Sequence, residues 1–148
     1  MSGFLGQDET LTAWGIDVTS YGLKAIELEV KRGDLIRVAL SGDYGKPRPA
    51  VVIQADVYSD IPSVAILPLT SELRSVPVVR VTIKPDRSNG LRVASQVMVD
   101  KPHTIARDKA GTVFGTLSAD DLMQVDQMLS SFLGLSGVKL EANNRSTT

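Results

Sequence analysis

The sequence predicts an α+β protein that is mainly β, a small barrel of short strands followed by one amphipathic helix near the C-terminus. Between Gly33 and Leu117, short β-branched and apolar runs alternate with turns rich in Gly, Pro, Asn and Asp. After Ser118, apolar residues recur at helical spacing. The length of 148 residues and the 43% hydrophobic content suit a single domain with one core.

The predicted strands are short and are separated by turn residues. They cover residues 35–40, 50–55, 63–71, 78–84, 92–99 and 111–117. Pro68 lies inside the third strand, and because proline cannot donate to a ladder, we expect an edge, a bulge or the end of the strand there. Residues 102–108 are expected to hold a helical turn, and residues 23–30 form a further strand-like stretch.

Residues 118–133 are predicted to form the amphipathic helix. Ser118, with Asp121 three positions later, resembles a capping box, and Gly134 is the expected stop signal. The polar end at 141–148 is predicted to be disordered. The apolar stripe of the helix is predicted to lie in the core and consists of Leu122, Val125, Met128, Leu129, Phe132 and Leu133.

Composition excludes several classes of chemistry. The chain has no cysteine, which excludes disulfides, thiolate nucleophiles and cysteine metal sites. His103 is the only histidine, and its place in a polar turn favours a structural role over a catalytic one. There is no P-loop, no GxGxxG and no metal-ligand cluster, so we expect no cofactor and no metal. No apolar run approaches the roughly 20 residues that span a bilayer, and no signal peptide is visible, so we expect a cytoplasmic protein without a membrane partner.

Arg48 and Thr70 are the side chains that the pattern does not explain as core. Pro47 and Pro49 push the residues before them, Lys46 and Arg48, toward extended backbone, which reduces the freedom of a long cation at the start of a strand. A guanidinium matches two phosphate oxygens, and a threonine hydroxyl adds a hydrogen bond to the same group. A surface ion pair for Arg48 and an ordinary strand position for Thr70 explain the same residues and stay open.

Five ordered segments together resemble the MazF/PemK family of toxin–antitoxin ribonucleases. They are KRGDLIRV at 31–38, RPAVVI at 48–53, PLTS at 68–71, SQV at 95–97 and LGL at 133–135. The resemblance implies a strongly curved, SH3-like β barrel of MazF/CcdB type with a C-terminal helix. It assigns residues 31–135 to the toxin domain.

The same resemblance implies a homodimer that cuts single-stranded RNA at short sequences without a metal and is held by a cognate antitoxin. Arg48 and Thr70 would be the catalytic pair, with the ribose 2′-hydroxyl attacking the adjacent phosphate to leave a 2′,3′-cyclic phosphate and a 5′-hydroxyl. The RNA contacts would come from Ser71, Gln96, Arg74, Arg80 and Arg37.

The chain departs from the family pattern at two points. The segment 41–47 is shorter than the corresponding loop in many relatives and lacks its glutamate, so Asp43 and Tyr44 are the candidates to supply RNA contacts there. Ser95 stands where relatives often have an acidic residue, so no role for a carboxylate is carried over to that position.

Two other functions stay open for the same fold. A non-nuclease toxin would poison a topoisomerase by protein binding through the end of the helix and the tail, although the ending NNRSTT lacks an apolar anchor. A catalytically silent barrel would bind RNA and leave it whole.

Residues 1–30 form an acidic extension and residues 136–148 a polar tail. The extension holds five carboxylates against one lysine, a net −4, whereas the remainder holds 15 basic and 12 acidic residues, a net +3. One explanation is a disordered leader or an upstream start. The other is an antitoxin-like segment, with Trp14 among acidic residues, that covers the RNA groove.

Overall fold

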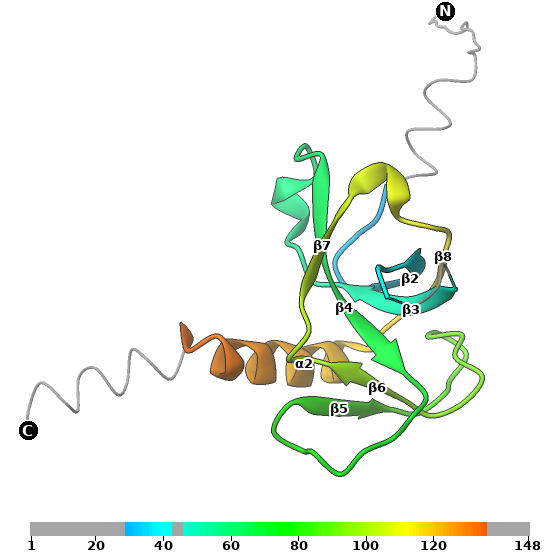
Figure 1. Cartoon of the computed structure of the whole chain (residues 1–148), viewed down its shortest axis with the longest axis vertical. Helices are drawn as coiled ribbons and strands as arrows, with labels where there is room; N and C mark the ends of the chain where they lie inside the picture. Colours follow the sequence, from blue (N-terminus) through cyan, green and yellow to red (C-terminus); the bar gives the residue numbers. More distant parts are fainter. Residues whose placement is uncertain (1–28, 43–45, 136–148) are drawn as a thin grey trace, which may run out of the picture. The chain divides into compact units, whose positions relative to one another are not determined.

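The computed structural model describes residues 29–42 and 46–135 (Figure 1). The strand-like stretch 23–30, apart from its last two residues, lies outside them. The predicted disordered end, Asp43 and Tyr44 also lie outside the described residues. Within the described part of the chain, no helix is long and apolar enough to cross a membrane.

The described residues form one curled sheet of antiparallel strands in the order β5-β6-β4-β3-β2-β8, with β7 paired to β4. One C-terminal helix, α2, accompanies the sheet (Figure 1). This confirms the predicted mainly β fold with a curved sheet. The strands are β2 Asp34–Ala39, β3 Pro47–Val52, β4 Ser63–Thr70, β5 Arg80–Ile83, β6 Ser95–Met98, β7 His103–Ala106 and β8 Val113–Thr116.

Strand β4 changes partners along one edge. Its first half pairs with β7 from Ser63 to Ile66, and its last two residues pair with β6 (Figure 1). Pro68 lies between these two pairings, where that edge has no ladder partner. The backbone of Ala65 forms hydrogen bonds toward the β3 side. Because the backbone groups of successive strand residues face opposite edges, the Pro68 nitrogen, which has no hydrogen to donate, faces the edge where β4 changes partner. The expectation of a local edge at Pro68 is confirmed.

Strand β3 begins three residues before the predicted 50–55 strand because Pro47, Arg48 and Pro49 pair with β2. On its other edge β3 pairs with β4 only from Ala50 to Val52. The Ile53 amide donates to the Ala65 carbonyl across that edge, at 3.0 Å. Because every second residue of a strand faces the same edge, the backbone nitrogens of Pro47 and Pro49 also face β4. Beyond Pro68, β4 no longer pairs with β3, and its opposite edge pairs with β6. A rift therefore opens between the two strands beside Pro47 and Pro49, which have no amide to donate across it.

The helical turn predicted at 102–108 is wrong over His103–Ala106, which form β7. Edge pairing with β4 decides the conformation there, because it satisfies the backbone along Ser63–Ile66. A 3₁₀ turn, η2, does follow at Arg107–Lys109. A second one, η1 at Asp56–Tyr58, lies beyond β3, which ends at Val52 rather than at residue 55.

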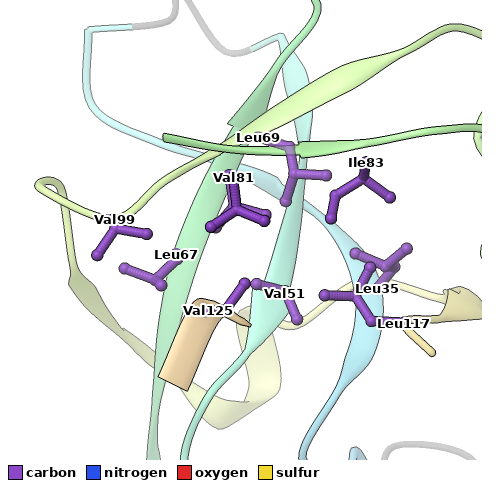
Figure 2. Packing of buried hydrophobic residues seen from close by; sticks show 10 residues of the cluster. Leu35, Val51, Leu67, Leu69, Val81, Ile83, Val99, Leu117 and Val125 are labelled. Atoms are coloured by element: carbon purple, nitrogen blue, oxygen red, sulfur yellow. The ribbon is translucent and has the colours of Figure 1, made fainter. Parts of the chain in front are cut away.

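Apolar side chains from the two halves of the sheet and from the helix meet in one core (Figure 2). Leu35 and Val51 come from β2 and β3, Leu67 and Leu69 from β4, and Val125 from α2. The remaining members are Val81, Ile83, Val97, Val99 and Leu117. The strands on both sides of the rift therefore pack on the same hydrophobic core.

Helix α2 spans Ala119–Phe132 and begins as predicted, with the Ser118 hydroxyl accepting a hydrogen bond from the Asp121 amide at 3.1 Å. Gly134 has a φ of +74° and follows the last turn, which is the expected stop. Val125 is fully buried, whereas Phe132 and Leu133 are 46% and 50% exposed. Their predicted place in the core is wrong because the end of the helix projects past the strands (Figure 1).

Replacing Ser118 with alanine should lower the free energy of unfolding by about 1 kcal/mol, because the Asp121 amide loses its acceptor. Urea unfolding followed by circular dichroism measures the change. Ser131→Ala, an exposed serine in the same helix, is the matched control and should stay within about 0.5 kcal/mol. Equal stability of both variants would show that the cap does not contribute.

Candidate functional site

The rift between β3 and β4 opens into two hollows. The first, which we call the proline hollow, has a volume of about 490 Å³ and reaches from Pro47 and Pro49 to the segment 90–93. The second, the arginine hollow, has a volume of about 360 Å³ and reaches from Pro68 to Lys101 and His103. Arg48 and Thr70 line both, so they form the ridge between the hollows.

The two ridge residues come from strands that diverge at this point. Arg48 is half-buried on β3, where its backbone pairs with Val38 of β2. Thr70 is the last residue of β4 and pairs with Gln96 of β6. The Glu72 amide donates to the Thr70 hydroxyl oxygen at 3.1 Å, which fixes the rotamer and leaves the hydroxyl able to donate its own hydrogen bond to a ligand. The two predicted catalytic residues thus share one site and neither is sealed in the core.

The arginine hollow is strongly cationic. Arg74, Arg80 and Lys101 line it together with Arg48, and Glu72 is the carboxylate that lines it among the described residues. Arg74 is exposed and pairs with Glu72 at 3.1 Å. The Arg80 side chain is only 9% exposed, and its Nε lies 3.9 Å from Asp100 Oδ1, with no hydrogen-bond partner for either atom. A buried guanidinium with such weak compensation favours an anion nearby.

His103 also lines the arginine hollow. It is exposed on β7, and its Nδ1 lies 2.9 Å from the Lys101 carbonyl oxygen. Because a carbonyl oxygen only accepts, this contact places the proton of the neutral ring on Nδ1. Among the described residues, no three His, Asp or Glu side chains gather as a metal site would require.

The proline hollow carries its own cations, Arg37, Lys46 and Arg92, in addition to Arg48. The Arg37 guanidinium lies 4.6 Å from the centroid of the Phe114 ring, a cation–π contact that orients it. Ser71 is exposed and lines this hollow as well. Of the predicted RNA contacts, Arg37 and Ser71 therefore lie on one side of the ridge, and Arg74 and Arg80 on the other.

Gln96 lines neither hollow. It is 6% exposed, and its amide oxygen accepts from the Arg74 amide at 2.9 Å while its Nε2 donates to the Arg74 carbonyl at 3.0 Å and to Thr82 Oγ1 at 3.2 Å. These bonds fasten the 71–79 segment to β6. The structure thus places Gln96 behind Arg74, which itself lines the arginine hollow.

Sequence reasoning missed Arg92 and Lys101 as lining residues and did not weigh Lys46 as an RNA contact. Arg92 follows the Asn89-Gly90 pair, so the sequence predicts a tight turn next to this cation. For Lys101 the sequence offers no such signal. Its position depends on the pairing of β4 with both β6 and β7, which lie on either side of it in the chain.

The curled sheet, the C-terminal helix and the shared ridge define a small β protein with a cationic rift that suits an anionic ligand. The chain belongs to the family of PemK-like, MazF-like toxins of type II toxin–antitoxin systems, whose model matches residues 31–133.

Two kinds of relatives support this assignment. The chain is 36% identical over 109 residues to a protein named probable endoribonuclease MazF from Mycolicibacterium smegmatis, covering 73% of this chain and all of that one. It also resembles the MazE–MazF structure from Deinococcus radiodurans, at a TM-score of 0.61 and 27% identity, covering 73% and 99%. The Mycobacterium tuberculosis toxin MazF-mt6 shares the fold, at a TM-score of 0.60 and 22% identity, covering 70% and 98%.

Replacing Gln96 with alanine should loosen the 71–79 segment, because both bonds to the Arg74 backbone are lost. Hydrogen exchange of the Arg74 amide should accelerate by roughly tenfold, the equivalent of about 1.4 kcal/mol. Thr82→Val is the control, since it removes only the third partner of Gln96. An unchanged exchange rate at Arg74 in Gln96→Ala would contradict this role.

Proposed function

We propose that the chain is the toxin of a type II toxin–antitoxin system and acts as an endoribonuclease on single-stranded RNA. The observation that carries this proposal is the position of Arg48 and Thr70 on a ridge shared by two cationic hollows. A nucleic-acid strand that crosses the ridge would place one phosphate against both side chains and the nucleotides on either side of that phosphate in the two hollows. The related protein named probable endoribonuclease MazF supports the same activity.

The proposed reaction is an attack of the ribose 2′-hydroxyl on the adjacent phosphorus. The new bond forms to the 2′-oxygen as the bond to the 5′-oxygen breaks, which gives a 2′,3′-cyclic phosphate and a 5′-hydroxyl. Such an intramolecular attack requires a fixed conformation, proton transfer and stabilisation of negative charge on the phosphoryl oxygens. This chain's own side chains would fix the conformation and stabilise the charge, and the proton can pass by way of a phosphoryl oxygen, so cleavage should not depend on a divalent metal.

Arg48 would clamp the phosphoryl oxygens as a permanent cation, while the proton of the 2′-hydroxyl passes by way of a phosphoryl oxygen to the leaving 5′-oxygen. A half-buried guanidinium on a strand loses little freedom on binding and stays charged at every biological pH. Thr70 would donate its hydroxyl proton to the same phosphate, because the Glu72 amide already occupies an acceptor position of that oxygen. Arg37, Arg74, Arg80 and Ser71 would contact the flanking nucleotides, and Gln96 would act by holding Arg74.

The partners that we propose are single-stranded RNA, a second copy of this chain and a cognate antitoxin. The structures of related toxins include one described as an endoribonuclease in complex with its cognate antitoxin and MazE–MazF complexes. The rift would attract an acidic antitoxin segment for the same electrostatic reason that it attracts RNA. Residues 31–135 would be sufficient for the activity.

One observation supports the second candidate function, protein binding by the end of the helix. Phe132, Leu133 and Leu135 are 46%, 50% and 61% exposed, and together they form an apolar end of α2. A toxin that poisons a topoisomerase would use this end and leave RNA intact. Incubation of purified protein with unstructured RNA separates the two functions, since only the nuclease produces internal cuts.

Arg48→Ala should lower the cleavage rate by about 100- to 1000-fold, because the main stabiliser of phosphoryl charge is lost. The measurement is a time course on a single-stranded RNA with EDTA present, and the wild-type products should carry 5′-hydroxyl ends. Arg87→Ala, an exposed arginine that lines neither hollow, is the control and should cleave normally. Wild-type rates in Arg48→Ala would remove Arg48 from the mechanism.

Thr70→Val keeps the shape of the side chain but removes the hydroxyl. Cleavage should slow by roughly 10- to 100-fold, the equivalent of one hydrogen bond to a charged group of about 1.5–3 kcal/mol. Thr70→Ser retains the hydroxyl and should recover most of the rate in the same assay. Equal rates for the valine and serine variants would mean that the hydroxyl plays no part.

A further inference from the structure

The proline hollow has the features of a base pocket, and the inference drawn from them rests on the proposed function. We propose that it holds the base beside the scissile phosphate and selects bases with a carbonyl oxygen at the position of uracil O4 or guanine O6 over cytosine and adenine, which carry an amino group there. The hollow begins at Arg48 and Thr70, so a base inside it is adjacent to the phosphate on the ridge.

The charges of the hollow are of one sign. Arg37, Lys46, Arg48 and Arg92 line it, and none of the described residues that line it is Asp or Glu. Arginine and lysine are donors only. Uracil O4 and guanine O6 accept such donors, whereas the amino groups of cytosine and adenine are themselves donors and would face cations. Hydroxyl groups do not offset these cations, because those of Thr70 and Ser71 can donate as well as accept, and Ser95 is only 5% exposed.

The walls of the hollow suit the flat faces of a base. Pro47, Pro49 and Leu91 contribute apolar surface, together with Leu69 and Val93. A volume of about 490 Å³ lies in the range of small-molecule pockets and accommodates one nucleotide. Apolar walls hold the ring of any base equally well. The donors at the rim contact the polar edge of the base and therefore decide which base binds.

The loop that precedes Arg92 and the Arg37 side chain are held in place before a ligand arrives. The buried Asn89 exchanges hydrogen bonds with Asp86, donates to the Lys84 carbonyl and accepts from the Leu91 amide. Ser88 accepts from the Thr116 amide at 2.8 Å, which docks this loop on β8. The Arg37 guanidinium is held against the Phe114 ring. Fixed donors discriminate between bases at a low entropic cost.

The arginine hollow provides the contrast within the same site. It contains Glu72, and Asp100 lies behind Arg80, so acceptors stand among its cations. It therefore has no reason to reject amino bases. The selection of carbonyl bases is assigned to the proline hollow alone.

The test uses full-length protein and two RNA oligonucleotides that differ by one base. Cleavage sites are first mapped on a long single-stranded RNA, and the base on each side of the cut is scored. Uracil or guanine should predominate on one side. A uracil at that position is then replaced with cytosine, which exchanges one carbonyl oxygen for an amino group, and the cleavage rate should fall at least fivefold. Binding of the same pair, measured by fluorescence anisotropy, should change in the same direction.

A charge reversal sharpens the test. Arg92→Glu places an acceptor in the hollow, so the preference for uracil over cytosine should shrink or reverse, because a carboxylate accepts from the cytosine amino group. Arg87→Glu, at an exposed position on the same loop outside the hollow, should leave the preference unchanged. Cleavage without any carbonyl-base preference, or an Arg92→Glu variant with the wild-type preference, would overturn the inference and leave the nuclease intact. Binding without cleavage would overturn the nuclease, while the anisotropy ratio would still decide the inference.

Discussion

The site depends on the absence of two backbone donors. Pro47 and Pro49 on β3 face β4, and they lie just before Ala50, where the pairing of these two strands ends. A continuous ladder would close this region, and its side chains would then be those of an ordinary sheet surface. Because these donors are missing, β3 and β4 do not pair beyond Ala50 and Pro68, and the rift opens between Arg48 and Thr70. The core beneath keeps the two halves at a fixed separation (Figure 2).

The positive charge that lines this rift favours an anionic ligand. The chain as a whole carries a formal charge of −1, yet seven arginines and lysines line the two hollows, against Glu72 among the described lining residues. The attraction for a polyanion is therefore local and falls steeply with salt. The same field would favour RNA and an acidic antitoxin segment, so the two would compete for one surface. An antitoxin segment that occupied the rift would then inhibit RNA binding without a conformational change in the toxin.

The sequence predicted the fold class, most strands, the helix and its cap, because hydrophobic period and turn residues are local signals. It predicted β7 wrongly, since His103–Ala106 become a strand only by pairing with β4, nearly 40 residues away. The exposed end of α2 was missed for a similar reason, because burial depends on where the sheet stops. For the site, the residues themselves pointed to Arg48 and Thr70, and the family resemblance assigned them as the catalytic pair. Tertiary packing brings Arg92 close to Arg37 and places Gln96 behind Arg74. No local sequence pattern predicts either position.

The central claim is that one phosphodiester lies on the Arg48–Thr70 ridge, with its neighbouring nucleotides in the two hollows. A crystal structure with an RNA oligonucleotide that carries 2′-deoxyribose at the cleaved position would test it most directly, since the attacking hydroxyl is missing and the strand stays whole. We predict a phosphate within hydrogen-bond distance of the Arg48 guanidinium and of Thr70 Oγ1, with a base between Pro49 and Leu91. A strand bound elsewhere, with both side chains turned away from it, would contradict the account.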